Sequence, residues 1–299
     1  MSHKKILLIG PTGQVGWELQ RCVQTLGEVV AVDKIDSTQA YIDLADPDSI
    51  RQVIRDVKPT IILNAAAYTA VDKAEEDAEL AHAINATAVG ILAEESLRLK
   101  SLLIHYSTDY VFNGKQTQPY TETDEVNPLG VYGTTKLAGE QAIEAVGGQY
   151  FILRTAWVYG LRGKNFLLTM QRLAKERNEL KVVADQFGAP TWSRMIAQAT
   201  THLLTQLDSP LYQLDIDALS GIYHLTCAGK TSWYDFAKAI IAQSDKQVRV
   251  LPLTTAEYPT PTERPAYSVL SNAKLAKTFG ITLPAWDRAL DLCLKSVEN

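Results

Sequence analysis

Apolar residues follow two alternating patterns along the first half of the chain. Uninterrupted apolar runs, such as residues 4–10 and 28–33, are followed by segments in which apolar residues recur every three or four positions, as Val15, Leu19 and Val23 do. Uninterrupted runs predict strands buried on both faces, and a spacing of three to four predicts helices with one apolar face. The pattern therefore predicts strands and helices in alternation.

This alternation continues to about residue 158. The expected strands lie at residues 4–10, 28–33, 60–67, 102–108 and 150–158, and the expected helices at 14–26, 46–57, 79–100 and around Tyr132. In the second helix, Asp46 is the expected N-cap and Pro47 the first helical residue. Strands that alternate with helices are typical of α/β proteins. We therefore predict an α/β fold with a doubly wound, Rossmann-like parallel sheet.

The spacing changes after residue 157. Helices are expected at 166–177 and 192–207, a short strand at 221–226, and turns around 257–268. We predict a dinucleotide-binding domain at residues 1–157. Residues 158–299 are expected to form mainly a smaller C-terminal α/β lobe that binds the substrate. Whether some strands or helices of this region also join the central sheet is left open. Such a lobe would lie over the carboxyl edge of the sheet, where open α/β sheets bind ligands.

The composition narrows the class of protein. Of the 299 residues, 46% are hydrophobic and 21% are charged, which is ordinary for a globular chain with a substantial core. The net charge of -5, with scattered Lys and Arg, argues against a nucleic-acid partner, and no run of roughly 20 apolar residues suggests a membrane partner. The three cysteines form no C-x-x-C pair and the five histidines no paired spacing, so we expect a cytoplasmic protein without a metal.

Three glycines follow the first strand at a spacing of three. Gly10, Gly13 and Gly16 allow a tight turn, a close approach to a pyrophosphate, and a helix N-terminus whose free N–H groups attract the anion. Asp33 ends the second strand about 20 residues later, where a carboxylate accepts hydrogen bonds from the adenosine ribose and favours NAD. Lys34 could instead meet a 2′-phosphate. The choice between NADH and NADPH therefore stays open.

A tyrosine and a lysine stand four residues apart in the segment "VYGTTKLAGE". On a helix, Tyr132 and Lys136 would share one face, and the ammonium would stabilise the phenolate and lower the pKa of Tyr132. Such a phenol can exchange a proton with a substrate near neutral pH. Thr108, at the end of the fourth strand beside Asp109, can donate a second hydrogen bond to a carbonyl oxygen. We predict that Thr108, Tyr132 and Lys136 are the catalytic residues of a hydride reductase.

Several longer strings extend this pattern over nearly the whole chain. "GPTGQVGWELQ", "NAAAYTAVDKAE", "IHYSTDYVFNG", "VYGTTKLAGE", "RTAWVYG", "DQFGAPT" and "RPAYS" resemble, in this order, the dTDP-4-dehydrorhamnose reductase family of the extended short-chain dehydrogenase/reductase superfamily. The resemblance implies reduction of the C4 ketone of dTDP-4-dehydro-β-L-rhamnose by NADPH or NADH. The product would be dTDP-β-L-rhamnose for cell-surface polysaccharide.

The resemblance also implies binding residues. By matching position, the cofactor would be contacted by Gly10, Thr12, Gly13, Gln14, Val15, Gly16, Asp33, Asp43, Leu44, Ala65, Ala66, Ala67, Tyr132 and Lys136. The sugar nucleotide would be contacted by Thr69, Val71, Thr108, Asp109, Trp157, Gln186, Phe187, Pro190 and Arg264. A tryptophan offers a flat face to a deoxysugar, and an arginine can bind a diphosphate with two hydrogen bonds. The alternatives are that Trp157 only packs in the core and that Arg264 is an exposed loop residue that contacts no ligand.

One position departs from the family pattern. Some bacterial members resemble one another in dimerising through a magnesium ion held by a glutamate of the first helix and an acidic residue after the "GAPT" string. Glu18 matches the first position, but Arg194 occupies the second. Magnesium prefers carboxylate and water oxygens, and a guanidinium does not ligate it. We therefore expect a monomer or a weak dimer without a magnesium bridge.

Two other functions are compatible with parts of the pattern. A nucleotide-sugar epimerase or 4,6-dehydratase uses the same scaffold, but dehydratases resemble one another in having an acidic pair after the catalytic threonine, and here Asp109 is followed by Tyr110. A non-catalytic subunit similar to the regulatory subunit of methionine adenosyltransferase is the second alternative. The intact set of Thr108, Tyr132 and Lys136 favours turnover.

Overall fold

A parallel sheet forms the centre of the molecule. The computed structural model describes residues 4–34, 40–243 and 246–296. Among these residues the sheet has seven strands in the order β11-β6-β5-β4-β1-β2-β3, and neighbouring strands are parallel. The strands are β1 (Lys5–Ile9), β2 (Glu28–Asp33), β3 (Ala40–Tyr41), β4 (Ile61–Asn64), β5 (Leu102–Thr108), β6 (Tyr150–Thr155) and β11 (Gly221–His224). The predicted Rossmann-like sheet is confirmed, and the second half of the chain contributes β11 to it.

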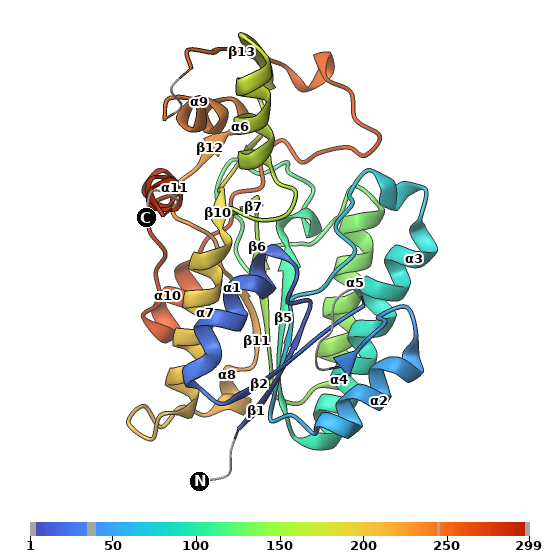
Figure 1. Ribbon diagram of the computed structural model, residues 1–299. Coiled ribbons are helices and arrows are strands. Elements are labelled where there is room, and N and C mark those ends of the chain that lie inside the picture. The colour runs from blue at the N-terminus through green and yellow to red at the C-terminus, as the bar shows by residue number, and fades with distance from the viewer. Residues whose placement is uncertain (1–3, 35–39, 244–245, 297–299) are drawn as a thin grey trace.

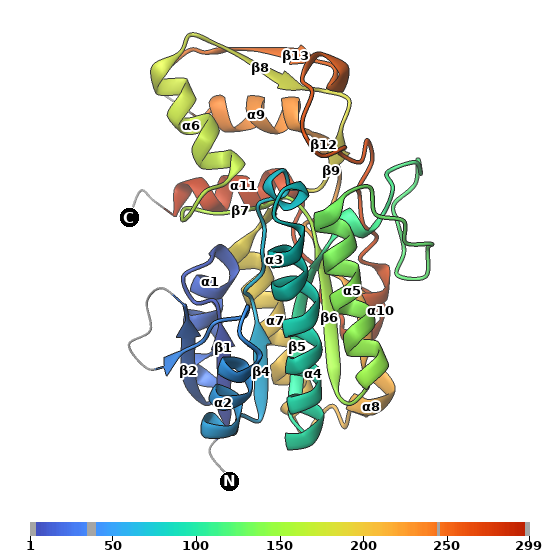
Figure 2. The same ribbon diagram turned by 90° about the vertical axis from the view of Figure 1, so that its right-hand side faces the viewer.

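Helices cover both faces of the sheet (Figures 1 and 2). One face carries α1 (Gln14–Cys22), α7 (Ser193–Asp208) and α10 (Ala273–Phe279), and the other carries α2 (Pro47–Val57), α4 (Ala88–Leu99) and α5 (Val131–Val146); a short helix, α8 (Ile216–Leu219), precedes β11. Side chains of β1 alternate between the two layers, because successive residues of a strand point to opposite faces. Ile6 and Leu8 lie in one core, and Leu7 and Ile9 in the other. No described helix is both long and apolar enough to cross a membrane.

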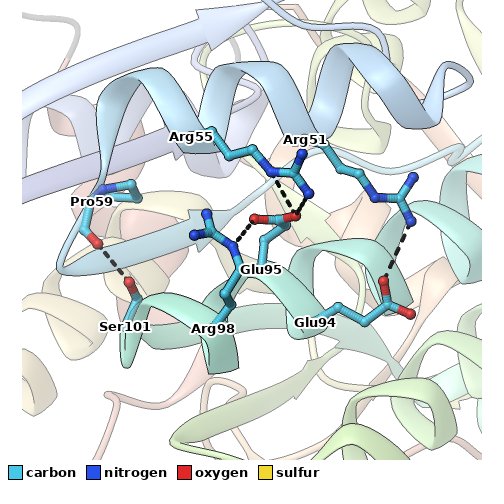
Figure 3. Close-up of polar contacts among 7 residues, drawn as sticks. All are labelled: Arg51, Arg55, Pro59, Glu94, Glu95, Arg98 and Ser101. Carbon is cyan, nitrogen blue, oxygen red and sulfur yellow. Dashed lines mark hydrogen bonds and ion pairs between the residues drawn. The ribbon is translucent and has the colours of Figure 1, made fainter.

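The helix α2 is held against α4 by a group of charged side chains (Figure 3). Glu95 of α4, whose exposed fraction is only 4%, accepts hydrogen bonds from Arg55 of α2 at 2.6 and 3.1 Å. Arg98 donates to the other carboxylate oxygen of Glu95 at 2.7 Å. Arg51 and Glu94 form a more exposed pair at 3.4 Å. The pairs Arg55–Glu95 and Arg51–Glu94 link α2 to α4, while Arg98 holds the Glu95 carboxylate from within α4.

The helix expected at 79–100 is not regular. It begins one residue earlier as α3 (Ala78–His82), widens into a π-helical turn at Ala83–Thr87, and then continues as α4. The side chain of Asn85 in this turn accepts a hydrogen bond from the backbone N–H of Tyr68 at 2.9 Å and donates to its carbonyl at 3.1 Å. The widened turn thus presents a side chain that holds the segment after β4, and π turns of this kind are frequent at functional sites.

A smaller lobe lies beyond the carboxyl ends of the strands (Figures 1 and 2). It contains α6 (Phe166–Glu176), β8 (Glu179–Val183), α9 (Trp233–Ile241), β13 (Arg249–Leu253) and α11 (Trp286–Lys295), and β8 pairs with β13. Two further short pairs stand apart from the seven-stranded sheet: β7 (Val158–Tyr159) with β10 (Thr191–Trp192), and β9 (Phe187–Gly188) with β12 (Thr231–Ser232). The apolar core of the lobe includes Leu167, Leu180 and Phe236. The division of function at residue 157 stays a prediction.

Candidate active site

The turn between β1 and α1 has the backbone shape that its glycines predict. Gly10 has a φ of 82°, and a Cβ at this position would lie 2.9 Å from the backbone nitrogen of Ala66. Gly13 is the N-cap of α1 and provides no side-chain cap, so the first N–H groups of the helix stay available for an anion. Gly16 is buried in α1 behind the turn. A pyrophosphate fits this turn, because the backbone of Gly10 and Gly13 leaves the helix N-terminus open to the cavity described below.

The end of β2 lies beside the same turn. Asp33 accepts a hydrogen bond from the hydroxyl of Thr12 at 2.6 Å and one from the backbone N–H of Lys34 at 2.7 Å. The ammonium of Lys34 pairs with Asp43 at 2.7 Å, and this hydrogen bond is the main cause that lowers the pKa of Asp43. Leu44 packs in the core between the sheet and α2. The carboxylate of Asp33 is thus placed for a ribose, while Lys34 already has an acidic partner.

A cavity of about 480 Å³ opens between this turn, the ends of β4 and β5, and the start of α5. It brings together most of the residues predicted for the cofactor and also residues that the sequence did not indicate. Its lining comprises Gly10, Thr12, Gly13, Gln14, Val15, Asp33, Ala65, Ala66, Ala67, Thr69, Tyr106, Ser107, Tyr132, Lys136, Thr155, Val158, Gly163 and Lys164. Tyr132 and Lys136 therefore face the same cavity as the glycine turn.

One loop of the second half closes the cavity near the glycine turn. Asn165 donates a hydrogen bond to the side chain of Gln14 at 2.8 Å, and the guanidinium of Arg162 lies 3.4 Å from the centre of the Trp17 ring. These contacts place Lys164 among the lining residues, where its charge suits a phosphate. No periodicity or motif in the sequence singled out Lys164, because its role depends on a contact over 151 residues of chain.

The start of α5 is packed tightly against the end of β5. A Cβ at Gly133 would collide with the carbonyl oxygen of Tyr110, so glycine is required for this close approach. The cap residue, Gly130, supplies no side-chain hydrogen bond, but Glu75 from a neighbouring 3-10 turn accepts one from the N–H of Val131 at 3.0 Å. As a result, the side chain of Tyr132 reaches the end of β5.

Thr108 and Tyr132 meet at this point. Their hydroxyl groups lie close enough to interact, and the Thr108 hydroxyl donates its hydrogen bond to Asp109 at 3.2 Å. Burial raises the pKa of the Tyr132 phenol, and the interaction with Thr108 lowers it only in part. Burial likewise raises the pKa of Asp109 to about 6, against interactions with the hydroxyls of Ser268 and Thr108. The predicted lowering of the Tyr132 pKa by Lys136 is wrong for this structure, because loss of hydration is the larger effect.

The ammonium of Lys136 has other partners. It donates to the carbonyl oxygen of Tyr106 at 2.7 Å and lies 3.1 Å from Nε2 of His105. Burial lowers the pKa of Lys136 to about 8, and the carboxylate of Glu140 counteracts this. The phenol of Tyr132 is thus held protonated, in the form that donates a proton, while Lys136 changes charge near physiological pH.

A second cavity, of about 540 Å³, lies between the sheet domain and the lobe. Three predicted substrate residues, Val71, Gln186 and Arg264, line it together with Trp233 and Tyr110. Arg264 pairs with Asp72 at 2.8 Å. Phe187 and Pro190 lie nearby, in β9 and before β10, but neither lines the cavity. Trp233 and Tyr110 were not predicted as substrate contacts, because neither residue belongs to a sequence motif with a defined chemical role.

Trp157 follows β6 in an unusual backbone conformation. Its φ is 47°, which is rare for a bulky residue, and this turn separates β6 from β7, so the strand expected at 150–158 is divided. The indole stacks on that of Trp233 with ring centres 3.5 Å apart. A Cβ at Gly188 would collide with the Trp157 ring, so Gly188 lies close against the same indole. Trp157 lines neither cavity.

Comparisons with known proteins show the family of the chain. The sequence model of the family described as the RmlD substrate binding domain matches residues 4–299. The chain is 48% identical to a dTDP-4-dehydrorhamnose reductase from Burkholderia thailandensis, covering 98% of this chain and 99% of that one, and 45% identical to one from Escherichia coli K12, covering 94% of each. The fold is similar to a dTDP-4-dehydrorhamnose reductase from Clostridium acetobutylicum, with a TM-score of 0.89, 39% identity, and coverage of 99% and 100%. A Bacillus anthracis enzyme in complex with NADP gives a TM-score of 0.86 and 34% identity, covering 99% of this chain and 100% of that one.

Proposed function

Since the chain belongs to the dTDP-4-dehydrorhamnose reductase family, we propose that Thr108, Tyr132 and Lys136 are its catalytic residues and that the two cavities hold its two ligands. The protein is an NAD(P)H-dependent oxidoreductase that reduces the C4 ketone of dTDP-4-dehydro-β-L-rhamnose to dTDP-β-L-rhamnose, in nucleotide-sugar and polysaccharide biosynthesis. The observation that carries the residue assignment is the meeting of Tyr132, Lys136 and the glycine turn at one cavity, with Thr108 next to Tyr132 at the end of β5.

NADPH or NADH, when bound, supplies the hydride for the ketone. The first cavity suits a dinucleotide because it joins a glycine turn, a helix N-terminus and the Asp33 carboxylate. We assign the pyrophosphate to the turn at Gly10 and Gly13, with Lys164 as an additional cation. We assign the adenosine ribose to the carboxylate of Asp33, which lies beside Asp43 and Lys34.

Thr108 and Tyr132 act on the ketone oxygen. Their hydroxyl groups lie next to each other, and a ketone oxygen can accept from both once the Thr108 hydroxyl, which donates to Asp109 in this structure, turns to the substrate. The raised pKa keeps the Tyr132 phenol protonated, and the alkoxide formed by reduction then takes this proton. Before the ketone binds, the carboxyl of Asp109 accepts the hydrogen bond of the threonine hydroxyl at 3.2 Å.

We assign the sugar nucleotide to the second cavity. Arg264 has an exposed fraction of 17% and is paired with Asp72, so it is ordered beside the cavity and suits a diphosphate. Val71 and Gln186 line the same space, and Thr69 lies two residues from Val71 at the first cavity. Phe187, Pro190 and Trp157 stay predictions as substrate contacts. Trp233 presents an indole to this cavity and is a further candidate for stacking.

The oligomeric state and the cellular location rest on two different features, the ion pair of Glu18 with Arg194 and the three cysteines. Arg194 of α7 forms an ion pair with Glu18 of α1 at 3.1 Å, so the carboxylate at the family's magnesium position already has a cationic partner. We propose a monomer or a weak dimer without a magnesium bridge. A cytoplasmic location is consistent with the three cysteines, which are all unpaired.

A coupled assay tests the proposed catalytic residues. The enzyme should consume NADPH or NADH in stoichiometric amounts with dTDP-4-dehydro-β-L-rhamnose, whereas an epimerase or dehydratase would return the cofactor unchanged. Tyr132→Phe should lower kcat by about 10²- to 10⁴-fold, the usual contribution of a general acid. Tyr159→Phe is the matched control, because this fully buried phenol lies in the lobe core and its hydroxyl has no partner among the described residues. Undiminished turnover in Tyr132→Phe would contradict the assignment.

A further inference from the structure

Three buried polar side chains form a chain behind the reacting centre. Lys136 of α5 lies 3.1 Å from Nε2 of His105, and Nδ1 of His105 lies 3.0 Å from Nδ2 of Asn64. His105 and Asn64 are opposite each other in the pairing of β5 with β4. The exposed fractions of Lys136, His105 and Asn64 are 2%, 1% and 1%. Polar groups this deeply buried are almost always hydrogen bonded, and the side chains of His105 and Asn64 find their partners in this chain.

The hydrogen-bond capacity of each group limits the possible arrangements. An ammonium has three N–H donors and no acceptor. One donor of Lys136 goes to the carbonyl of Tyr106, and the contact at 3.1 Å requires that Nε2 of His105 accepts a second. A histidine that accepts at Nε2 and is neutral carries its proton on Nδ1.

The proton on Nδ1 then defines the orientation of Asn64. An N–H at Nδ1 cannot face the amide N–H of Asn64, so the amide oxygen must occupy the position 3.0 Å away. The Oδ1 atom of Asn64 has no partner in the described part of the chain, which agrees with this exchange. The two amide atoms look alike in shape and are assigned from their hydrogen bonds.

We propose that His105 is a positioning residue for Lys136: as the neutral Nδ1–H tautomer, held by Asn64, it accepts one ammonium N–H and leaves the third N–H of Lys136 directed into the cofactor cavity. The inference rests on the proposed role of Lys136. It adds a requirement that the established activity does not state, namely that a buried imidazole of fixed tautomer determines where the lysine donates.

The surrounding charges support a neutral imidazole. Burial and the nearby charge of Lys136 both lower the pKa of His105 far below its ordinary value. Glu140, one turn after Lys136 on α5, is fully paired with Arg154 of β6 at 2.6 to 3.2 Å, so it does not supply a free carboxylate. Tyr132, Tyr110 and Asp109 are further ionisable groups near the reacting centre. Among the described residues, an imidazolium beside the ammonium would have no free carboxylate in contact with it.

The tautomer can be observed directly in the wild-type protein. Long-range ¹H–¹⁵N correlation spectra of the histidine rings, with His105 assigned by comparison with His105→Gln, should show a neutral ring protonated at Nδ1 from pH 6 to pH 8. A ring protonated at Nε2, or an imidazolium in this range, would overturn the inference. This measurement needs no turnover, so it separates the inference from the proposed function.

Two variants test the consequence for Lys136. His105→Leu removes the acceptor, so the ammonium becomes less stable, the pKa of Lys136 falls below about 8, and the alkaline limb of the kcat profile moves to lower pH. We expect kcat to fall on the order of 10- to 100-fold, as for a misplaced catalytic group. His105→Gln keeps an acceptor oxygen and should recover most of kcat and the original pH limb.

A second buried histidine provides the control. His224 is fully buried in β11 and bonded to the carbonyl of Tyr120, away from the cavity, so His224→Leu should lower Tm but leave the pH limb in place. Equal shifts in His105→Leu and His224→Leu, or a wild-type profile in His105→Leu, would reject the positioning role. If His105→Leu does not fold, the inference is tested by the tautomer of His105 in the wild-type NMR spectra alone. Full activity in Lys136→Met would instead refute the proposed function.

Discussion

Glu75 and Val131 are 56 residues apart in the chain, yet the carboxylate of Glu75 accepts a hydrogen bond from the backbone N–H of Val131 at 3.0 Å. The bond supplies the side-chain cap that Gly130 does not provide for the helix of Tyr132 and Lys136. A carboxylate at a helix N-terminus also interacts favourably with the helix dipole. The helix that carries the reacting groups is therefore stabilised from outside its own sequence.

Removing this cap should weaken both the fold and the reaction. We expect Glu75→Ala to lower the free energy of unfolding by about 1 kcal/mol, as for other lost N-caps, and to lower kcat more than it raises KM. Glu75→Gln keeps an acceptor oxygen and should lose less. Urea unfolding and steady-state kinetics measure the two effects, and a Glu75→Ala protein as stable as Glu75→Gln would contradict the capping role.

The choice of cofactor should depend on Asp33. Its carboxylate is fixed by Thr12 at 2.6 Å and repels a 2′-phosphate at the adenosine ribose. Two such charges about 4 Å apart interact by about 1 to 4 kcal/mol, so Asp33→Asn should raise the ratio of kcat/KM for NADPH over NADH by about 10-fold. Asp56→Asn, an exposed carboxylate of α2, controls for the change in net charge. An unchanged ratio in Asp33→Asn would exclude Asp33 as the determinant.

Magnesium should not change the mass of the protein in solution. Because Glu18 is paired with Arg194, sedimentation should give the same species with magnesium and with a chelator. Arg194→Glu would place two carboxylates together and should make association dependent on magnesium. A magnesium-dependent dimer of the unaltered chain is the result that this prediction does not allow.

Acid should weaken the contact between α2 and α4. Burial raises the pKa of Glu95, but the hydrogen bonds from Arg55 and Arg98 outweigh it, so the pKa in the folded state is below the ordinary 4.5. The stabilisation is therefore present above pH 4.5 and is lost as the pH falls through the lower, folded-state value.

Substitution of this carboxyl provides the comparison. Near pH 7, Glu95→Gln should cost about 1 kcal/mol, a charged hydrogen bond discounted because the arginine head groups are about half exposed. The difference in Tm between wild type and Glu95→Gln should narrow below pH 4.5. Glu94→Gln removes a more exposed carboxylate as the control. A difference that is constant from pH 7 to pH 3 would show that ionisation of Glu95 does not matter.

The local parts of the site followed from the sequence. The turn at Gly10, the cap at Asp46 and the placement of Tyr132 and Lys136 on one helix depend on neighbouring residues, so spacing and residue type suffice to predict them. The order of strands and helices is predicted for the same reason. The family strings then extend the prediction to the substrate.

The remaining features depend on packing between distant segments. The pKa of Tyr132 is raised by burial, which spacing does not reveal, so the expected lowering of this pKa was wrong. The π turn at Asn85 and the placement of Lys164 arise from contacts over long stretches of chain. No local pattern in the sequence encodes such contacts.

The stacked indoles of Trp157 and Trp233 have a practical consequence. Trp157 directly follows the central sheet, whereas Trp233 begins a helix of the lobe, and their parallel rings are close enough for their electronic transitions to couple. Near-ultraviolet circular dichroism should therefore contain an exciton signal that disappears when the lobe separates from the sheet. The intensity of this signal would therefore report whether the lobe is in contact with the central sheet.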